Sequence, residues 1–563
     1  MSDSRSFNRR FSLFFLVVLF ARCESKTYAY VSIEDGNYTV HQVNESLEIP
    51  SNYIVKAVYD NQINNTGWAF LEIYAEEETE DIDEMKAYAA GLIEGALTKD
   101  LIWMHWVNTL EGRCKDKQHT CERIANYTDI NLLWITSNYL EYSASDPYWY
   151  QVKLFMKQLD GLASGYATAV TDTNKQLSYR DILSINMLLD LEDLFEAMGE
   201  DHKEGNGHCS VLIKILPDGS DVFVAHDTWN NYQSMIRLQK KYVLKYKTLP
   251  NEETTIIGHT MSFPSYPGTL GSIDDFYITS ANLITLETTI GNTNKDIWKL
   301  VSPTGQVMEF VRSMVANRLA ETGKNWTDIF RKFNSGTYNN QWMVVDYKKF
   351  APGKKALQNL KPGFLWVLEQ IPGTIEAQDM TSLLKEQGYW ASYNIPYFSN
   401  IYNTSGWPEQ VKKYGDWFTH DKNPRAQIFK RDQGNINNMD DMYALMRYND
   451  FMHDPLSKCD CNPPYSAENA IASRNDLNKV NGTYPFKDLT HRSYGATDAK
   501  ITNTHLATTF QFLSVAGPTH NASRGVPPFR WSEAAFGNTT PHVGHPDLWQ
   551  FEPLTFKWEW GGK

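Results

Sequence analysis

The stretch that decides the fold is Glu204-Gly205-Asn206-Gly207-His208-Cys209-Ser210-Val211-Leu212-Ile213-Lys214-Ile215-Leu216. A polar loop that contains glycines ends abruptly at a cysteine, and the apolar run that follows is typical of a buried strand. The pattern predicts that Cys209 is the first residue of this strand. The loop before it is the kind of exposed polar segment in which chains are cut.

Cleavage of the His208–Cys209 peptide would give Cys209 a free α-amino group beside its own thiol. An α-amine titrates at about 7.7–8.0, well below lysine, so it can accept the thiol proton and activate the nucleophile. We therefore expect an N-terminal nucleophile hydrolase. In such a protein an N-to-S acyl shift breaks the His208–Cys209 bond, and the exposed cysteine then attacks an ester or amide carbonyl.

The first residues of the chain predict entry into the secretory pathway. Arg5, Arg9 and Arg10 precede an apolar run, Phe11–Ala21, which is too short to span a bilayer but suits the core of a signal peptide. We expect residues 1–25 to be this signal peptide, and the product to reside in the lysosome or to be secreted. Asn-x-Ser/Thr sequons support this route, and they lie at Asn37, Asn44, Asn64, Asn126, Asn325, Asn403, Asn481, Asn521 and Asn538.

The six cysteines are too few for a disulfide scaffold, so their spacing matters more than their number. Cys114 and Cys121 would close a small loop, while Cys459 and Cys461 would form a tight bridge or pair elsewhere. Cys23 either leaves with the signal peptide or stays in a flexible terminus, which leaves Cys209 unpaired. Cys209 is then either a reactive thiol or a small buried apolar side chain, and its place after the glycine loop favours reactivity.

Composition and charge fit a large globular enzyme. Hydrophobic residues make up 42% of the chain and aromatic residues 13%, which is enough for one extended core or two closely packed ones. The net charge of −14 argues against nucleic acid as the main partner. The basic run Lys240–Lys247 is a local exception. We expect it to be a solvated face, with peripheral contact to anionic lipid headgroups of a membrane as the alternative.

The loop Gly199–His208 divides the chain into two fragments. Helical periodicity predominates before it and strand patterns after it, which predicts an α+β fold of antiparallel strands with helices outside them. We expect a largely helical fragment from residue 26 to 208 and a nucleophile-bearing catalytic fragment from 209 to 563, packed as one globular unit. The expected helices are Ile82–Leu110, Trp149–Tyr166, Ser178–Met198, Gly305–Glu321 and Asn325–Phe333. The expected strands are Cys209–Leu216, Asp221–Ala225, Asp275–Ser280, Asn282–Thr289, Trp342–Asp346 and Phe364–Gln370.

Several segments along nearly the whole chain after the signal peptide carry a family resemblance. They are Gly207–Ser210, His226–Trp229, Leu286–Thr289, Tyr338–Trp342, Ser392–Phe398, Pro424–Gln433, Met446–Asn449 and Phe529–Trp531. In this order they resemble the phospholipase B-like proteins. The resemblance implies an αββα N-terminal nucleophile hydrolase sandwich, that is, two antiparallel sheets with flanking helices. It also implies lysosomal or secreted residence, cleavage into two fragments that remain associated, and acyl-hydrolase activity.

Residues near the second strand of the first hairpin are candidates to assist Cys209. His226 and Asp227 follow Cys209 closely enough in sequence for the returning strand to bring them beside the nucleophile. Alternatively, His226 is a turn histidine and Asp227 caps a turn at residues 228–231. Related cysteine hydrolases of the bile-salt and penicillin-acylase type carry an arginine near this place, so the histidine is a departure from their pattern.

Two further catalytic candidates come from later segments. Asn394 precedes Ile395-Pro396, where the proline holds the backbone extended, and we expect its amide to donate to the oxyanion of the tetrahedral intermediate. Arg425 would place positive charge near the nucleophile or orient Asp227. The alternatives are a loop asparagine that makes turn bonds and an ordinary ion pair. Residues that would line the site, or merely satisfy backbone groups, are Trp229, Thr288 and Asn340.

Other catalytic motifs are absent from the sequence. It contains no Gly-x-Ser-x-Gly nucleophile elbow, no His-Glu-x-x-His zinc helix and no phosphate-binding glycine loop, and Cys459-x-Cys461 lacks a second pair of metal ligands. We therefore expect neither a cofactor nor a metal. The predicted function is removal of fatty acyl chains from glycerophospholipids. The alternatives are an amidase on N-acyl lipids or peptides, and a non-catalytic lysosomal glycoprotein that binds lipid or protein.

Overall fold

The computed structural model describes residues 26–75, 82–200 and 209–560. The predicted signal peptide at residues 1–25, and His208 of the predicted cleavage bond, lie outside these residues. The described chain is a mixture of helices and strands, so the predicted α+β class is confirmed. In this part of the chain no helix combines the length and the apolar character that crossing a bilayer requires.

The larger sheet runs through eleven strands in the order β13-β12-β11-β10-β9-β8-β7-β4-β3-β1-β2. All neighbours are antiparallel except β4 and β7, so the prediction of purely antiparallel sheets is wrong for this pair. The strands before residue 76 were not predicted, so the first fragment contains strands as well as its predicted helices. The strands are β1 Thr27–Glu34, β2 Asn37–Val43, β3 Val55–Gln62, β4 Trp68–Ala75, β7 Arg237–Leu244, β8 Thr260–Ser265, β9 Phe276–Thr279, β10 Leu283–Thr289, β11 Asn340–Asp346, β12 Leu365–Ile371 and β13 Thr374–Asp379.

The second sheet carries Cys209. Its order is β14-β5-β6-β16-β17-β20, with β15 also paired to β6. The prediction ended the second strand at Ala225, but β6 continues to Asn231, so the predicted turn at residues 228–231 is wrong. The strands are β5 Cys209–Ile215, β6 Val222–Asn231, β14 Tyr389–Ser392, β15 Tyr494–Ala496, β16 Asp498–Thr502, β17 Leu513–Ala516 and β20 Leu554–Thr555, and a separate pair is β18 Phe529–Arg530 with β19 Leu548–Trp549.

The two sheets face each other across a shared apolar core. Val211 and Val224 of the second sheet belong to the same hydrophobic cluster as Leu286, Met343 and Val345 of the larger sheet. Side chains alternate between the two faces of a strand, so Leu212 and Ala225 point the other way and pack with helix residues in a separate cluster. Each sheet therefore has one face on the other sheet and one face on helices.

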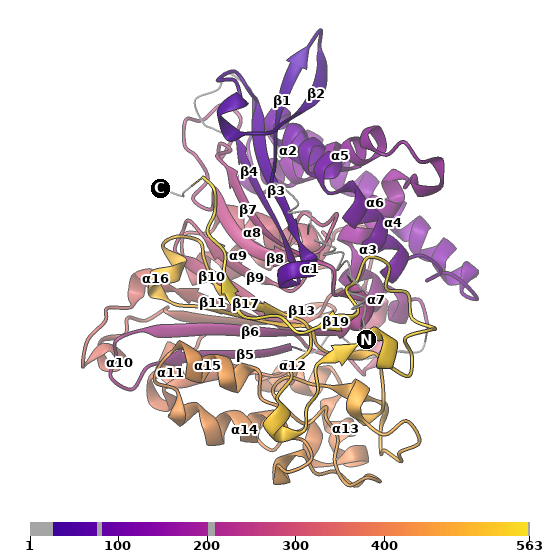
Figure 1. Ribbon diagram of the computed structural model, residues 1–563. Coiled ribbons are helices and arrows are strands. Elements are labelled where there is room, and N and C mark those ends of the chain that lie inside the picture. Colours follow the sequence, from indigo (N-terminus) through magenta and orange to yellow (C-terminus); the bar gives the residue numbers. More distant parts are fainter. Residues whose placement is uncertain (1–25, 76–81, 201–208, 561–563) are drawn as a thin grey trace, which may run out of the picture.

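One group of helices covers the outer face of the larger sheet through the largest apolar cluster. It comprises α2 Asp83–Leu97, α3 Lys99–Thr109, α4 Gln118–Tyr142, α5 Pro147–Ala169, α6 Tyr179–Asn186, α7 Leu188–Ala197, α8 Glu309–Leu319 and α9 Gly323–Phe330. The long helix α4 was not predicted. In Figure 1 the other group lies beneath β5 and β6 and includes α11 Thr381–Gln387, α12 Ser399–Thr404, α13 Trp407–Tyr414, α14 Pro424–Asp432 and α15 Met439–Met446. Short helices are α1 Ile63–Thr66, α10 Ala356–Asn359 and α16 Thr504–Ala507.

The basic run Lys240–Lys247 is not the solvated face that the sequence indicated. Lys240 and Lys241 are buried within β7, where Lys240 forms an ion pair with Glu94 at 2.7 Å and Lys241 one with Glu72 at 2.9 Å. Buried charges are tolerated when they are paired and hydrogen-bonded. These two ammonium groups are therefore part of buried ion pairs and do not present charge to a lipid surface.

The covalent features of the described chain agree with the sequence. Cys114 is bonded to Cys121 and Cys459 to Cys461, which confirms both candidate pairs, and Cys209 is free. The asparagines of all the sequons are exposed to solvent. Attachment of glycans there stays a prediction.

Candidate active site

Cys209 begins β5 and lies directly opposite Thr228 of β6. It is buried, with 4% of its surface exposed, and the backbone N–H of Trp229 donates a hydrogen bond to its thiol. Burial, followed by the negative charge of Glu287, raises the pKa of the Cys209 thiol well above its ordinary value. The thiol is therefore protonated at rest and needs a base before it can attack a carbonyl.

The backbone of Cys209 is held at both ends by side chains. Its nitrogen donates to the Oδ1 of Asn394 at 3.2 Å, and its carbonyl oxygen accepts from Nη1 of Arg425 at 2.7 Å. Asn394 lies just after β14 with φ of 70°, a left-handed conformation that asparagine tolerates better than most residues. Its Nδ2 donates to the carbonyl of Thr289 at 2.7 Å. The oxyanion role stays a prediction, because the amide oxygen faces the cysteine nitrogen and one amide hydrogen already has an acceptor.

Arg425 connects the nucleophile to the helices behind the second sheet. It lies in the first turn of α14 and is buried, and its Nη2 donates to the carbonyl of Tyr393 at 2.8 Å. Its guanidinium lies 4.3 Å from the centre of the Trp229 ring, within cation–π range. Burial lowers the pKa of Arg425 to about 10, so the side chain keeps its charge at neutral and acidic pH. These hydrogen bonds go to backbone carbonyls and fix the position of Cys209.

His226 lies on the same face of β6 as Thr228 and therefore on the side of Cys209. Its Nε2 is 3.0 Å from the carbonyl oxygen of Glu287. Because a carbonyl can only accept, Nε2 carries the hydrogen and the lone pair is on Nδ1, which lies 3.4 Å from the hydroxyl of Thr228. Burial and the charge of Lys500 lower the pKa of His226 well below its ordinary value. His226 is a neutral and weakly basic imidazole.

Asp227 points away from this face. Its register partner is Ser210, and both side chains lie on the helix-covered side of the sheet, opposite to that of Cys209 and His226. Burial raises the pKa of Asp227 well above its ordinary value, although the charge of Arg447 opposes this. The sequence placed His226 and Asp227 together at a strand end, but adjacent residues of a strand cannot share a face. The structure brings only His226 to the side of the thiol.

Glu287 of β10 is the residue that sequence reasoning missed. The sulfur of Cys209, a ring nitrogen of His226 and a carboxylate oxygen of Glu287 all lie within 4.8 Å of one another. Burial raises the pKa of Glu287 well above its ordinary value. The available signal was its presence in the segment Leu286–Thr289, which carries the family resemblance. Nothing in the local sequence distinguished it from a strand residue facing solvent.

A tyrosine connects Glu287 to a second buried carboxyl group. The hydroxyl of Tyr338 lies 2.8 Å from Oε1 of Glu287 and 2.6 Å from Oδ2 of Asp275. One hydroxyl hydrogen cannot serve two carboxylates at once, so one of the two carboxyl groups must carry a proton. The other oxygen of Glu287, Oε2, is buried and has no hydrogen-bond partner. This free oxygen belongs to the carboxylate beside Cys209.

The three predicted lining residues surround this centre. Thr288 is hydrogen-bonded to Ser392 at 2.6 Å, and Ser392 lies opposite Val211 of β5. Asn340 of β11 lies opposite Thr289 of β10 and is buried, and its side-chain amide has no hydrogen-bond partner. Trp229 donates from its ring nitrogen to the carbonyl of Ile471 at 3.1 Å. Thr288 and Trp229 thus form hydrogen bonds with neighbouring protein groups, whereas the Asn340 amide forms none.

A buried ionic network lies next to the β6 residues of the site. Lys500 of β16 donates to the hydroxyl of Thr228 and lies 2.8 Å from Asp498, which also pairs with Arg237 at 3.0 Å. Arg237 forms a further ion pair with Asp274. Each cation has a carboxylate partner, as buried charges require. Because these residues come from distant parts of the chain, no local sequence pattern indicates the network.

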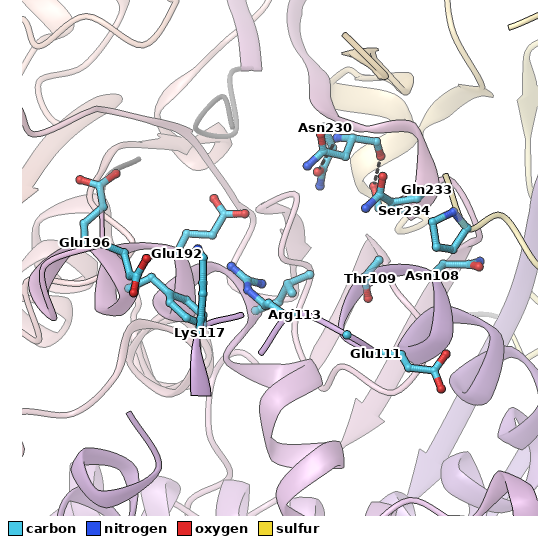
Figure 2. Close-up of a pocket in the computed structure, with 16 residues that line it drawn as sticks. Asn108, Thr109, Glu111, Arg113, Lys117, Glu192, Glu196, Asn230, Gln233 and Ser234 are labelled. Atoms are coloured by element: carbon cyan, nitrogen blue, oxygen red, sulfur yellow. Dashed lines mark hydrogen bonds and ion pairs between the residues drawn. The ribbon is translucent and has the colours of Figure 1, made fainter. Parts of the chain in front are cut away.

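A cavity of about 410 Å³ lies next to the Cys209 end of the β5–β6 hairpin. Asn230 and Asn231, which line it, follow shortly after Thr228, the register partner of Cys209. Figure 2 shows Arg113 in the middle of this cavity, with Lys117 and Glu192 on one side and Thr109 on the other. A second cavity of about 330 Å³ shares Arg113 and Phe195 with the first. Its lining is more apolar and includes Trp106, Leu110, Ile124, Leu183, Met187 and Leu191.

The comparisons with known proteins agree with one another. A family model described as Phospholipase B matches residues 55–556. Two proteins named "Putative phospholipase B-like 2" are similar to this chain. The human protein is 47% identical over 511 residues, covering 89% of this chain and 85% of its own. The mouse protein is 46% identical over 511 residues, covering 89% and 84%.

A more distant relative extends the same likeness. "Phospholipase B-like protein B" of Dictyostelium discoideum is 36% identical over 543 residues, covering 94% of this chain and 89% of its own. The family model and these relatives span most of the described residues, including the Cys209 hairpin and the segments that contribute Glu287, Asn394 and Arg425. The chain therefore belongs to the phospholipase B family.

Proposed function

We propose that this protein is a lipid acyl hydrolase whose nucleophile is an N-terminal cysteine, Cys209, exposed by self-cleavage. The observation that carries the proposal is the contact between the backbone nitrogen of Cys209 and Asn394 at 3.2 Å. Cleavage would convert this nitrogen into an amine that is already positioned beside the thiol. The fold that accommodates this chemistry is the αββα N-terminal nucleophile sandwich, with the two facing sheets as its inner layers.

Self-cleavage would begin with attack of the Cys209 sulfur on the carbonyl carbon of residue 208. The carbon–nitrogen bond of the peptide breaks, a thioester forms, and the nitrogen takes up the proton that the thiol released. Water then hydrolyses the thioester, which leaves a free carboxyl group on residue 208 and a free amine on Cys209. Arg425 supports this step because its hydrogen bond to the Cys209 carbonyl holds the residue in place.

Turnover uses the same groups. The α-amine of Cys209 takes the thiol proton, the thiolate attacks an ester carbonyl, and the amine returns the proton to the departing alcohol. Water then attacks the acyl thioester and releases the fatty acid. His226 is a poor base because its pKa is lowered well below its ordinary value. We therefore assign the role of general base to the α-amine of Cys209. His226 would instead hold Glu287 in position through its hydrogen bond to the Glu287 carbonyl.

The two neighbouring cavities, which share Arg113 and Phe195, support an amphiphilic substrate. The first contains Arg113 and Lys117, which could hold a phosphate, together with the acidic side chains of Glu192 and Glu196. The second is lined mainly by apolar side chains and could take a fatty acyl chain. A glycerophospholipid has both parts. Removal of both acyl chains would make the protein a phospholipase B in activity as well as in family.

The cellular setting belongs to the same proposal. We place the mature protein in the lysosome or outside the cell, with residues 26–208 and 209–563 remaining associated as one body after cleavage. The exposed sequon asparagines support passage through the secretory pathway. The disulfides support an oxidising compartment.

The test combines the state of the chain with the products it releases. Mass spectrometry of the purified protein should find a fragment that begins at Cys209, and Cys209→Ala should stay in one piece. The mature protein should release free fatty acid and a glycerophospho-headgroup from a defined glycerophospholipid. Release of an amine from an N-acyl lipid, with esters untouched, would replace the proposal by an amidase. Lipid that is retained unchanged would indicate a binding protein.

A further inference from the structure

We propose that the nucleophile centre is also a zinc-binding site, formed by Cys209, His226 and Glu287. A sulfur, a ring nitrogen and a carboxylate oxygen from these residues lie within 4.8 Å of one another, and all three residues are buried. Thiolate, imidazole and carboxylate are the ligand types that bind Zn²⁺ in proteins. In the part of the chain that the structure describes, this is the one group of three such side chains whose donor atoms come so close.

Each of the three donors already has the outer contact that a metal ligand requires. Metal-binding histidines usually give their second ring hydrogen to a carbonyl or carboxylate. Here Nε2 of His226 donates to the carbonyl of Glu287 at 3.0 Å, so the metal would bind the lone pair of Nδ1 in place of the Thr228 hydroxyl, which lies 3.4 Å away. Oε1 of Glu287 is held by Tyr338 at 2.8 Å, while Oε2 has no hydrogen-bond partner. The backbone N–H of Trp229 donates to the sulfur of Cys209.

Self-cleavage would add a fourth ligand, and this part of the inference rests on the proposed function. Zinc prefers four ligands in a tetrahedron. The amine and the thiolate of an N-terminal cysteine can bind one ion together in a five-membered ring. Binding releases the thiol proton, one ammonium proton and, where Glu287 is the carboxyl group that is protonated, the proton of Glu287 to solvent. A remaining N–H of the amine can still donate to Asn394. Without cleavage, water would fill the fourth position.

Two positively charged side chains, Lys500 and Arg425, lie near the site, and two of the ligands that zinc would bind are anionic. The positive charge of Lys500 lowers the pKa of the Cys209 thiol, so this ammonium group lies close enough to act on the site. Lys500 is paired with Asp498 at 2.8 Å. Its charge is therefore matched before an ion arrives, whereas Cys209 and Glu287 would both be anionic as ligands. A bound zinc ion would occupy the thiolate and the amine together. It would act as a reversible inhibitor that must leave before a substrate can react.

The first test uses cobalt and needs no variant. Co²⁺ added to the mature protein, with Cys209 verified as the start of the second fragment, should give a thiolate-to-cobalt charge-transfer band and the visible spectrum of a tetrahedral site. One equivalent of Zn²⁺ should abolish this spectrum. A mature protein that shows no such band would overturn the inference. A band without any hydrolysis of acyl substrates would instead overturn the proposed function and leave the zinc site standing.

The second test locates the site by titration calorimetry with ZnCl₂. Glu287→Gln and His226→Gln should each weaken zinc binding by more than about 10-fold, the smallest usual cost of losing even an outer-shell partner. His453→Gln is the matched control, because His453 is an exposed histidine beside Asp450 on the surface and should leave zinc binding unchanged. Equal affinity in all three variants would mean that zinc binds elsewhere. A chelator should restore full hydrolysis to zinc-treated wild type.

Discussion

The side-chain oxygen of Asn394 accepts a hydrogen bond from the backbone nitrogen of Cys209 at 3.2 Å, across a gap of 185 residues in the sequence. In an N-terminal nucleophile this nitrogen becomes the amine that activates the thiol. Here the contact gives Asn394 a second role beside the one predicted for it, because it can orient the amine that cleavage would release.

Replacing Asn394 with alanine should therefore impair both reactions of the site. We expect turnover to fall by roughly 100-fold or more with little change in substrate binding, because contacts to the amine and to the developing oxyanion matter most in the transition state. Self-cleavage should also slow. The measurements are kcat and KM on a verified acyl substrate and the fraction of cleaved chain over time.

Asn340→Ala is the natural comparison for Asn394→Ala. Asn340 is also buried beside the site, but its amide has no hydrogen-bond partner, so its loss removes no hydrogen bond of the resting protein. We expect a much smaller effect on cleavage. If Asn394→Ala folds, matures and turns over normally, Asn394 has no place in the mechanism.

His226→Gln distinguishes the amine mechanism from a cysteine–histidine pair. Glutamine can still donate to the carbonyl of Glu287, as Nε2 of His226 does at 3.0 Å, but it cannot accept a proton. Loss of a general base typically costs about 10²- to 10⁴-fold. Because the α-amine is the proposed base, we expect a loss of kcat below about 10-fold. A loss of 1000-fold or more, in a variant with the melting temperature of wild type, would assign the proton to His226.

The sequence was sufficient where local pattern decides structure. The apolar run after Cys209 became β5 as predicted, and the helix predicted at Trp149–Tyr166 became α5. The single helices predicted at Ile82–Leu110 and Ser178–Met198 are each two helices, α2 with α3 and α6 with α7. The prediction failed where tertiary contacts override the local pattern. A turn at Thr228–Asn231 was the alternative interpretation, yet these residues extend β6, and β15 pairs with the last three of them. Lys240 and Lys241 were predicted to lie on a solvated face, yet both are buried in ion pairs with carboxylates from elements distant in the sequence.

The residues of the candidate site also divide into those that local sequence indicates and those that depend on tertiary contacts. Cys209, Asn394 and Arg425 were found from motifs, and the structure places both Asn394 and Arg425 in direct contact with the backbone of Cys209. Asp227 was grouped with His226 by proximity in sequence, which ignores the alternation of side chains along a strand. Glu287 was missed because its importance depends on Tyr338 and His226, which reach it from other strands and loops.

The apolar cavity provides a prediction about substrate length. Ala125 of α4 is a small residue in its lining, and phenylalanine there would fill part of the space that we assign to an acyl chain. Ala125→Phe should lower kcat/KM for long-chain esters by about 10-fold or more, while short-chain esters keep most of their rate. Ala125→Ser is the control, since it adds little volume. Equal losses for short and long chains would mean that the acyl group binds elsewhere.

Glu369 of β12 predicts how stability depends on pH. It is fully buried, and three donors reach its carboxylate, the backbone N–H groups of Tyr397 and Phe398 and the side chain of Gln341. These donors lower its pKa, but burial has the larger effect and raises the pKa of Glu369 from 4.5 to about 7. Glu369 is therefore a carboxyl group that the folded protein prefers to keep protonated.

The sign of the effect follows from linkage. Below pH 4.5 the group is protonated in both the folded and the unfolded chain, and its contribution is fully present. As the pH rises towards 7 the unfolded chain ionises more readily, so the folded state loses stability by up to about 3 kcal/mol from this group. Glu369→Gln cannot ionise and should lack this loss.

The free energy of unfolding, measured in urea at several pH values from 4.5 to 7, should fall less steeply in Glu369→Gln than in wild type. Glu386→Gln, which removes an exposed carboxylate from α11, should keep the wild-type slope. Identical slopes for wild type and Glu369→Gln would show that Glu369 ionises alike in the folded and unfolded chain.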